Sequence, residues 1–181
     1  MKKAFLFLAN GFEESEAIVP TDILRRGGVD LLMVSVMSKK EVVSTNNIAV
    51  TADRLFDECD FSAADMLILP GGMPGAKNLN EHDGLKTLLA GFAAKGGLVA
   101  AICAAPLVLG GLGLLKGRKA TCYPGFESYL EGAICTAQPV EVDGTIITGR
   151  GPGYAYDFGF ALLTALMGEE VARQVKAGMF P

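Results

Sequence analysis

One cysteine in the sequence has the surroundings of a nucleophile. In the segment LVAAICAAPLVL, Cys103 follows an apolar run that predicts a buried strand, and a helical pattern begins directly after it. Its neighbours Ala101, Ala104 and Ala105 are small, as a sharp turn from a strand into a helix requires. Such a turn would raise the thiol over a sheet edge at a helix N-terminus, which favours the thiolate. The residues alone leave a second interpretation open, in which Cys103 is an inert core cysteine.

A second turn, NGFEESEA, places three glutamates at the start of a predicted helix. Glu13 and Glu14 are explained by the helix dipole, which stabilises carboxylates in the first turn. Glu16 differs because an apolar run follows it, so its side chain could point back over the sheet edge. A carboxyl buried there would have a raised pKa and could donate a hydrogen bond.

A third turn, LPGGMPGA, ends another apolar strand and leaves backbone N–H groups with little side-chain cover. Gly71 and Gly72 could therefore form an oxyanion hole or an anion nest. The segment lacks the glycine spacings of phosphate-binding and dinucleotide-binding loops. By itself it is equally compatible with a simple change of chain direction.

Hydrophobic periodicity predicts the elements that would position these turns. The predicted strands are 2–9, 29–37, 65–70, 97–102 and 120–123, with hairpins over 42–52 and 139–149. The predicted helices are 13–26, 82–95, 104–115, 126–131, 154–167 and 169–178. Alternating strands and helices predict an α/β fold with a mostly parallel sheet and helices on both faces. All three turns follow strand ends, where active sites of such sheets lie. No repeat or linker interrupts the pattern, so we predict one domain over residues 1–181.

Composition excludes several classes of partner. The chain has 181 residues and a net charge of −4, with no basic face, so we expect no nucleic-acid partner. No apolar run reaches the roughly 18 residues of a membrane span, so we expect no membrane association. The cysteines are widely spaced and form no C-x-x-C motif, which predicts reduced thiols in a cytoplasmic protein. Because His82 is the only histidine, we expect no metal site.

Four segments together make the sequence resemble the ThiJ/PfpI superfamily, and within it the branch of the parkinsonism-associated protein deglycase. They are NGFEESEAIVPTDILRRGG, LILPGGMPGAKNL, LVAAICAAPLVL and ITGRGPGYAYDF. The resemblance implies a flavodoxin-like three-layer sandwich, a homodimer and no cofactor. It makes Cys103 the nucleophile and Glu16 its protonated partner. It also implies that the N–H groups of Gly72 and Ala104 bind an oxyanion.

Two positions depart from the pattern of the superfamily. In its protease branch a histidine directly follows the cysteine, whereas this chain has Ala104. Many members of the deglycase branch carry a histidine where this chain has Tyr123, which makes Tyr123 the candidate third member of the site. A proteolytic Cys–His pair therefore has no visible base.

The first functional hypothesis is an enzyme acting on a small aldehyde or reactive dicarbonyl in oxidative or carbonyl stress. It would convert methylglyoxal to lactate, or remove glyoxal adducts from proteins, as the resemblance implies. The alternative is a non-enzymatic redox sensor or chaperone dimer that responds to oxidation of Cys103. An intracellular peptidase or amidase is less favoured. For the thiol of Cys103, we expect the helix N-terminus and Glu16 to lower the pKa by more than burial raises it.

Overall fold

A seven-stranded sheet forms the centre of the protein in the computed structural model, which describes residues 1–179. The strand order is β10-β11-β7-β6-β1-β2-β5, and every neighbouring pair is parallel except β10 with β11. In chain order these strands are β1 (Lys3–Leu8), β2 (Asp30–Ser35), β5 (Arg54–Leu55), β6 (Met66–Leu69), β7 (Leu98–Ile102), β10 (Val140–Asp143) and β11 (Ile146–Gly149). The predicted mostly parallel sheet is confirmed.

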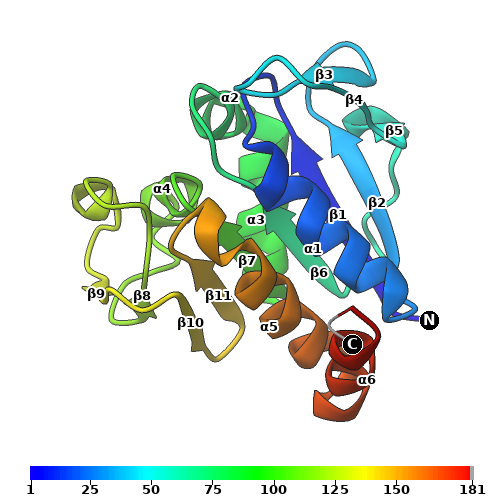
Figure 1. Cartoon of the computed structure of the whole chain (residues 1–181). Coiled ribbons are helices and arrows are strands. Elements are labelled where there is room, and N and C mark those ends of the chain that lie inside the picture. The colour runs from blue at the N-terminus through cyan, green and yellow to red at the C-terminus, as the bar shows by residue number, and fades with distance from the viewer. Residues whose placement is uncertain (180–181) are drawn as a thin grey trace.

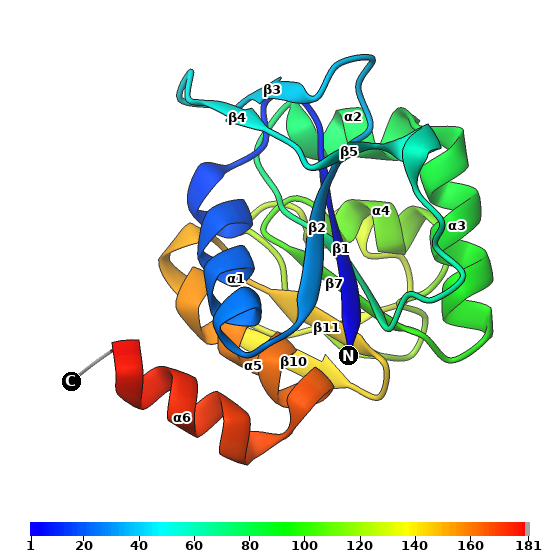
Figure 2. The ribbon, with the colours of Figure 1, turned by 90° about the vertical axis from the view of Figure 1, so that its right-hand side faces the viewer.

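Helices cover both faces of this sheet (Figures 1 and 2). One face carries α1 (Glu14–Arg26), α5 (Ala155–Met167) and α6 (Glu169–Met179). The other face carries α2 (Gly75–Glu81), α3 (Asp83–Ala94) and α4 (Pro106–Gly111). The predicted three-layer sandwich is therefore confirmed. None of the helices within residues 1–179 is long and apolar enough to cross a membrane.

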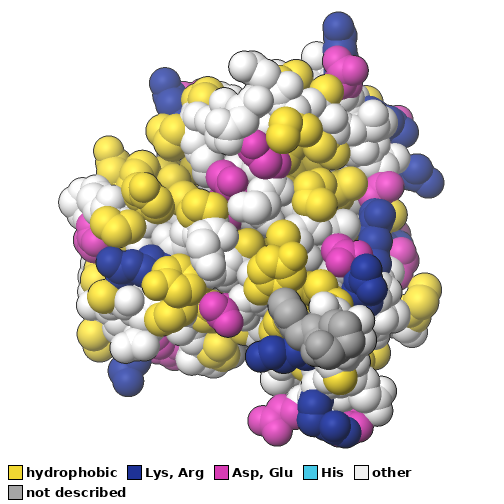
Figure 3. All heavy atoms as spheres, in the orientation of Figure 1, with side chains coloured by type: hydrophobic (Ala, Val, Ile, Leu, Met, Phe, Trp, Pro, Cys, Tyr) yellow, Lys and Arg dark blue, Asp and Glu magenta, His cyan; other side chains and the backbone are white. Residues whose placement is uncertain are grey.

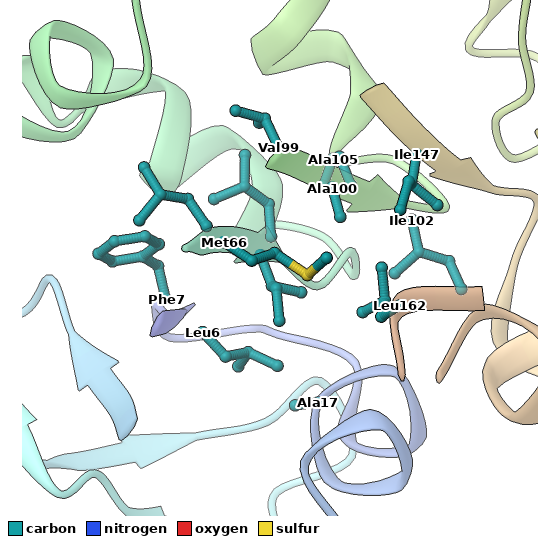
Figure 4. Packing of buried hydrophobic residues seen from close by; sticks show 14 of the residues in the cluster. Leu6, Phe7, Ala17, Met66, Val99, Ala100, Ile102, Ala105, Ile147 and Leu162 are labelled. Carbon is teal, nitrogen blue, oxygen red and sulfur yellow. The ribbon is translucent and has the colours of Figure 1, made fainter. Parts of the chain in front are cut away.

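The central strands are apolar on both faces, as strands covered by two helical layers must be. β6 is buried at every position, and β1 is buried from Ala4 to Leu8. Figure 4 shows side chains of neighbouring strands packing together with Ala17 of α1 and Leu162 of α5. This core holds the strand ends in fixed positions, and the three predicted turns leave from those ends.

Two small sheets lie outside the central one. The hairpin predicted at 42–52 is present as β3 (Glu41–Val43) paired antiparallel with β4 (Ala49–Thr51). β8 (Lys119–Ala120) is shorter than the strand predicted at 120–123 and pairs in parallel with β9 (Ile134–Cys135). Three short 3₁₀ turns complete the described chain: η1 (Phe56–Glu58), η2 (Glu127–Tyr129) and η3 (Pro152–Tyr154).

Two predicted helices are shorter in the structure. The helix predicted at 104–115 spans only Pro106–Gly111, because Gly110 and Gly111 weaken it and Gly113, with φ of +71°, turns the chain away. The helix predicted at 126–131 is the single 3₁₀ turn η2. The helix α2 was not predicted, since its sequence is rich in residues that form helices poorly.

Candidate active site

The backbone at Cys103 forms a sharp turn from β7 toward α4. Its φ is +64°, a left-handed conformation that non-glycine residues rarely adopt. The turn is held by its neighbours: the N–H of Cys103 donates to the Gly149 carbonyl at 2.9 Å, and its carbonyl accepts from the Tyr123 N–H at 2.8 Å. Strained backbone of this kind persists only where the surrounding structure enforces it. The structure thus places Cys103 on the strand-to-helix turn predicted from its small neighbours.

The glycine turn after β6 approaches Cys103 closely because Gly71 has no side chain. A Cβ at Gly71 would lie 2.6 Å from the Cβ of Cys103 and 2.7 Å from Oε2 of Glu16. Real Cβ atoms do not approach other atoms this closely, so glycine is required at this position. The third turn, which carries Glu16, meets the other two here.

The side chain of Glu16 is fully buried. Its Oε2 accepts a hydrogen bond of 2.8 Å from the N–H of Gly71, and its carboxyl lies within hydrogen-bonding reach of the Cys103 thiol. The second oxygen, Oε1, is buried without a well-aligned partner among residues 1–179. Glu13 fixes the start of α1, where its Oε2 accepts from the N–H of Glu16 at 2.8 Å. The early glutamates therefore have different roles, as their sequence context indicates.

The pKa of the Glu16 carboxyl is raised from 4.5 to about 8, chiefly by burial and to a lesser extent by the charge of Glu13. The contacts with Cys103 and with the N–H of Gly71 oppose this rise, but burial outweighs them. Glu16 is therefore mostly protonated at neutral pH and can donate a proton. This agrees with the pKa direction expected for a carboxyl buried behind an apolar run.

The expected lowering of the Cys103 pKa is wrong. The pKa of the thiol is raised to about 12, chiefly by burial and then by the neighbouring Glu16 carboxylate when it is ionised. The N–H groups of Gly72 and Ala104 lower this pKa, but by less. The reason is that the turn does not lift the sulfur into solvent, since only 7% of Cys103 is exposed. The Glu16 carboxyl and the Cys103 thiol therefore affect each other's titration. Once the carboxyl has lost its proton, its negative charge makes the thiol hold its own proton more tightly.

Two backbone donors converge on the sulfur. The N–H groups of Gly72 and Ala104 both lie within hydrogen-bonding reach of the Cys103 thiol. Gly72 has a φ of +86°, and a Cβ there would overlap the backbone of residues 11–13. Glycine is therefore required for this donor as well. The structure brings four of the predicted site residues together: Cys103, Glu16, Gly72 and Ala104.

Tyr123 joins the site through its backbone. Its N–H holds the Cys103 carbonyl, whereas its side chain is 45% exposed and lies beside Gly151 and Phe126. His82 lies elsewhere, at the start of α3, where its Nδ1 accepts from the Leu85 N–H at 3.0 Å. Within residues 1–179 no group of three or more His, Cys, Asp or Glu side chains is placed to hold a metal.

Sequence reasoning missed the part of the β3–β4 hairpin that clamps the site. The N–H of Thr45 donates to the Phe12 carbonyl at 2.8 Å, and its Oγ1 donates to the Met73 carbonyl at 3.3 Å. Asn46 Nδ2 donates to Oε1 of Glu14 at 2.7 Å. The hairpin thereby ties the acidic turn to the glycine turn. These contacts join residues that are far apart in the sequence, so no local sequence pattern predicts them.

Fold and site together define a flavodoxin-like protein with a cysteine at a strand-to-helix turn over the sheet edge. A model of the DJ-1/PfpI family matches residues 2–165. The chain belongs to this family, which confirms the resemblance carried by its four segments.

Three relatives show how far the similarity extends. Protein DJ-1 homolog B of Arabidopsis thaliana is 41% identical over 96% of this chain, which spans only 40% of that relative's length. The structure of oxidized Toxoplasma gondii DJ-1 has a TM-score of 0.94 and 34% identity, covering 99% of this chain and 98% of the other. A C103A mutant of a Salmonella typhimurium DJ-1 superfamily protein has a TM-score of 0.93 and 36% identity, covering 100% of both chains.

Proposed function

We propose that this protein is a cysteine-dependent, cofactor-independent enzyme that converts reactive dicarbonyls such as methylglyoxal to 2-hydroxy acids such as lactate. The observation that carries the proposal is the buried, protonated carboxyl of Glu16 against the thiol of Cys103. The reaction needs a nucleophile and a nearby group that can move a proton between two adjacent carbons. Membership of the DJ-1/PfpI family supports the proposal.

The first step adds the sulfur of Cys103 to the aldehyde carbon of methylglyoxal. A C–S bond forms, and the thiol proton ends on the aldehyde oxygen, which gives a hemithioacetal. The N–H groups of Gly72 and Ala104, which face the sulfur, lie where they can stabilise the negative charge that develops on that oxygen. No metal is needed, because these donors supply the electrostatic stabilisation.

The second step moves a proton from the former aldehyde carbon to the neighbouring ketone carbon. Glu16 protonates the ketone oxygen and accepts the C–H proton, giving an enediol. It then places a proton on the second carbon and takes one back from the hydroxyl beside sulfur. The first carbon is oxidised to a thioester and the second is reduced to an alcohol. A pKa of about 8 suits a carboxyl that must both give and take a proton near neutral pH.

Water completes the reaction. It adds to the thioester carbonyl, the C–S bond breaks, and the sulfur regains a proton. The products are lactic acid and free Cys103, so methylglyoxal and one water account for every atom. The enzyme returns to its starting state without an external oxidant or reductant.

The test is a turnover assay with methylglyoxal in the absence of glutathione, with lactate measured as product. Cys103→Ser should abolish lactate formation, and Glu16→Gln should lower turnover by about 10²–10⁴-fold, as for other general acid–base groups. The matched control is Glu14→Gln, which alters a carboxylate of the same helical turn that interacts with Asn46 instead. No lactate from the wild-type protein would overturn the proposal.

A redox-sensing role is the second candidate. One observation favours it: a close structural relative is the oxidized form of Toxoplasma gondii DJ-1. Backbone donors around the sulfur would also stabilise the oxygens of a sulfinate. Peroxide titration followed by peptide mass spectrometry tests this role, which requires Cys103 to gain oxygen before Cys59, Cys122 or Cys135 does.

We also propose a homodimer, on the strength of the family resemblance, and a cytoplasmic location, on the strength of the widely spaced cysteines. The first helix carries the apolar residues Ile18, Val19, Ile23 and Leu24 but adds little support for a dimer. Ile23 and Leu24 are fully buried within this chain, and of these four only Ile18 is markedly exposed, at 41%. Light scattering at micromolar concentration decides between monomer and dimer.

A further inference from the structure

A groove of about 330 Å³ lies on the surface between α2, α4 and η2. Met73, Leu107, Phe126 and Tyr129 form its apolar and aromatic wall, and polar side chains, among them Lys77 and Glu131, line the remainder. Figure 3 shows hydrophobic side chains gathered on this part of the molecule, over α4 and the loop that follows β8. A volume of this size lies at the lower end of the range typical of small-molecule sites.

Each wall of the groove is anchored to a residue that contacts Cys103. Met73 directly follows Gly72, whose N–H faces the sulfur. On α4, the N–H of Leu107 donates to the carbonyl of Ala104 at 3.1 Å. The groove therefore starts one residue after Gly72 and one helical turn after Cys103, although Cys103 itself does not line it.

The third wall, formed by Phe126 and Tyr129, is also linked to Cys103 through backbone hydrogen bonds. The N–H of Phe126 donates to the Tyr123 carbonyl at 3.1 Å, and the N–H of Tyr123 donates to Cys103 at 2.8 Å. The rings of Tyr123 and Phe126 have centroids 6.5 Å apart, and those of Phe126 and Tyr129 are 5.7 Å apart. A row of aromatic rings thus runs from Tyr123, whose backbone contacts Cys103, to Phe126 and Tyr129 in the groove.

Several large apolar side chains in and beside the groove are exposed. Met73 and Tyr123 are each 45% exposed and Tyr129 is 56% exposed, whereas Phe126 is half-buried. Large apolar side chains that gather on the surface mark places where something binds. Aromatic walls suit an aromatic occupant, since edge-to-face ring pairs add about 0.5–1.5 kcal/mol beyond buried area.

We propose that the groove binds an aromatic or branched apolar substituent carried by the dicarbonyl. The preferred substrates would then be aryl-substituted or large alkyl-substituted dicarbonyls, with phenylglyoxal as the probe and methylglyoxal as the small reference. This assignment rests on the proposed function for its substrate chemistry. The groove itself, however, can be tested without turnover.

The first measurement compares kcat/KM for phenylglyoxal with kcat/KM for methylglyoxal. Phe126→Ala, which removes a wall, should lower this ratio about tenfold. Gly111→Leu should lower it by filling the groove, because Gly111 lies in the lining and a Cβ there makes only an ordinary contact of 3.9 Å with Oδ1 of Asn80. Gly111→Ala adds one carbon and should have a smaller effect than Gly111→Leu. Phe92→Leu is the control, because Phe92 lies beside Gly97, before the start of β7, whereas Cys103 follows its end.

The second measurement needs no turnover. It compares the rates at which 2-chloroacetophenone and chloroacetone alkylate Cys103, where the sulfur displaces chloride and forms a C–S bond. The aryl reagent should be favoured in the wild-type protein, and Phe126→Ala and Gly111→Leu should each reduce that preference about as much as they reduce the substrate ratio.

The outcomes separate the two proposals. If labelling preference falls in the groove variants while no dicarbonyl is turned over, the groove assignment holds and the proposed function fails. If methylglyoxal is turned over but both ratios stay at wild-type values in the Phe126 and Gly111 variants, the groove assignment is overturned and the function stands. Because one variant opens the groove and the other fills it, misfolding of either one leaves the test intact.

Discussion

The buried carboxyl of Glu16 reaches from α1 to the backbone of Gly71, whose N–H donates to Oε2 at 2.8 Å. A Cβ at Gly71 would lie 2.7 Å from this oxygen and 2.6 Å from the Cβ of Cys103. The glycine turn therefore sets the separation between the carboxyl and the sulfur. It also leaves Oε1 as the oxygen without a well-aligned partner within residues 1–179, and our proposal assigns the exchange of a proton with substrate to this oxygen.

The raised pKa of Glu16 makes stability depend on pH. The unfolded carboxyl loses its proton near 4.5, whereas the folded one keeps it until about pH 8. Between these values the folded state binds more protons, so the free energy of unfolding falls as pH rises. Glu16→Gln lacks this dependence. Urea unfolding from pH 5 to 9 should show the variant gaining stability relative to wild type up to about pH 8. A difference that does not change with pH would contradict the burial assigned to Glu16.

The raised pKa of Cys103 predicts how fast it is alkylated. Because burial and the Glu16 carboxylate both raise this pKa, the rate with iodoacetamide should still be increasing at pH 9–10. Glu16→Gln removes the carboxylate, so above pH 8 the variant should react faster than wild type. Cys135, an exposed thiol, provides the internal reference, and its rate should not respond to the substitution. If the alkylation rate of Cys103 had already levelled off at pH 6, the pKa of the thiol would be low after all, as the helix N-terminus led us to expect.

Substitutions at two glycines with similar backbone conformations can distinguish the energetic cost of backbone strain from the cost of steric overlap. Gly72 and Gly28 have φ of +86° and +78°, yet a Cβ at Gly28 meets nothing within 4 Å, whereas one at Gly72 overlaps backbone atoms. Gly28→Ala should lower the free energy of unfolding by about 1–2 kcal/mol, the cost of left-handed backbone alone. Gly72→Ala should cost clearly more, and it should reduce dicarbonyl turnover because it displaces an N–H donor. Equal losses in urea unfolding would show that the crowding at Gly72 is relieved at no cost.

The meeting of three distant turns could be predicted from the sequence, because each follows an apolar strand and parallel strands end at one sheet edge. Glu16, Gly72 and Cys103 do meet there. The direction of the Cys103 pKa shift could not be predicted, since it depends on how deeply three-dimensional packing buries the sulfur.

Elements held by tertiary contacts were also missed. The helix α2 has weak intrinsic propensity, and one contact that holds it is the hydrogen bond of 2.9 Å from Asn78 Nδ2 to the Asn10 carbonyl. The pairing of β8 with β9 involves two residues from each strand, too few to produce a periodic pattern.

At position 103 the backbone conformation should make a glycine variant more stable than an alanine variant, the reverse of the usual order. In ordinary strands and helices, replacing alanine by glycine costs about 0.5–1 kcal/mol, because glycine has more freedom to lose on folding. At φ of +64° any residue with a Cβ is strained, by about 1–3 kcal/mol, and only glycine escapes. Cys103→Gly should therefore be about 1 kcal/mol more stable than Cys103→Ala in urea unfolding. The control is Ala101→Gly in β7, which removes the same atom from a buried strand position and should destabilise the protein. If Cys103→Gly proved the less stable of the two, the turn would not store the strain assigned to it, and the small neighbours of Cys103 would be explained by packing alone.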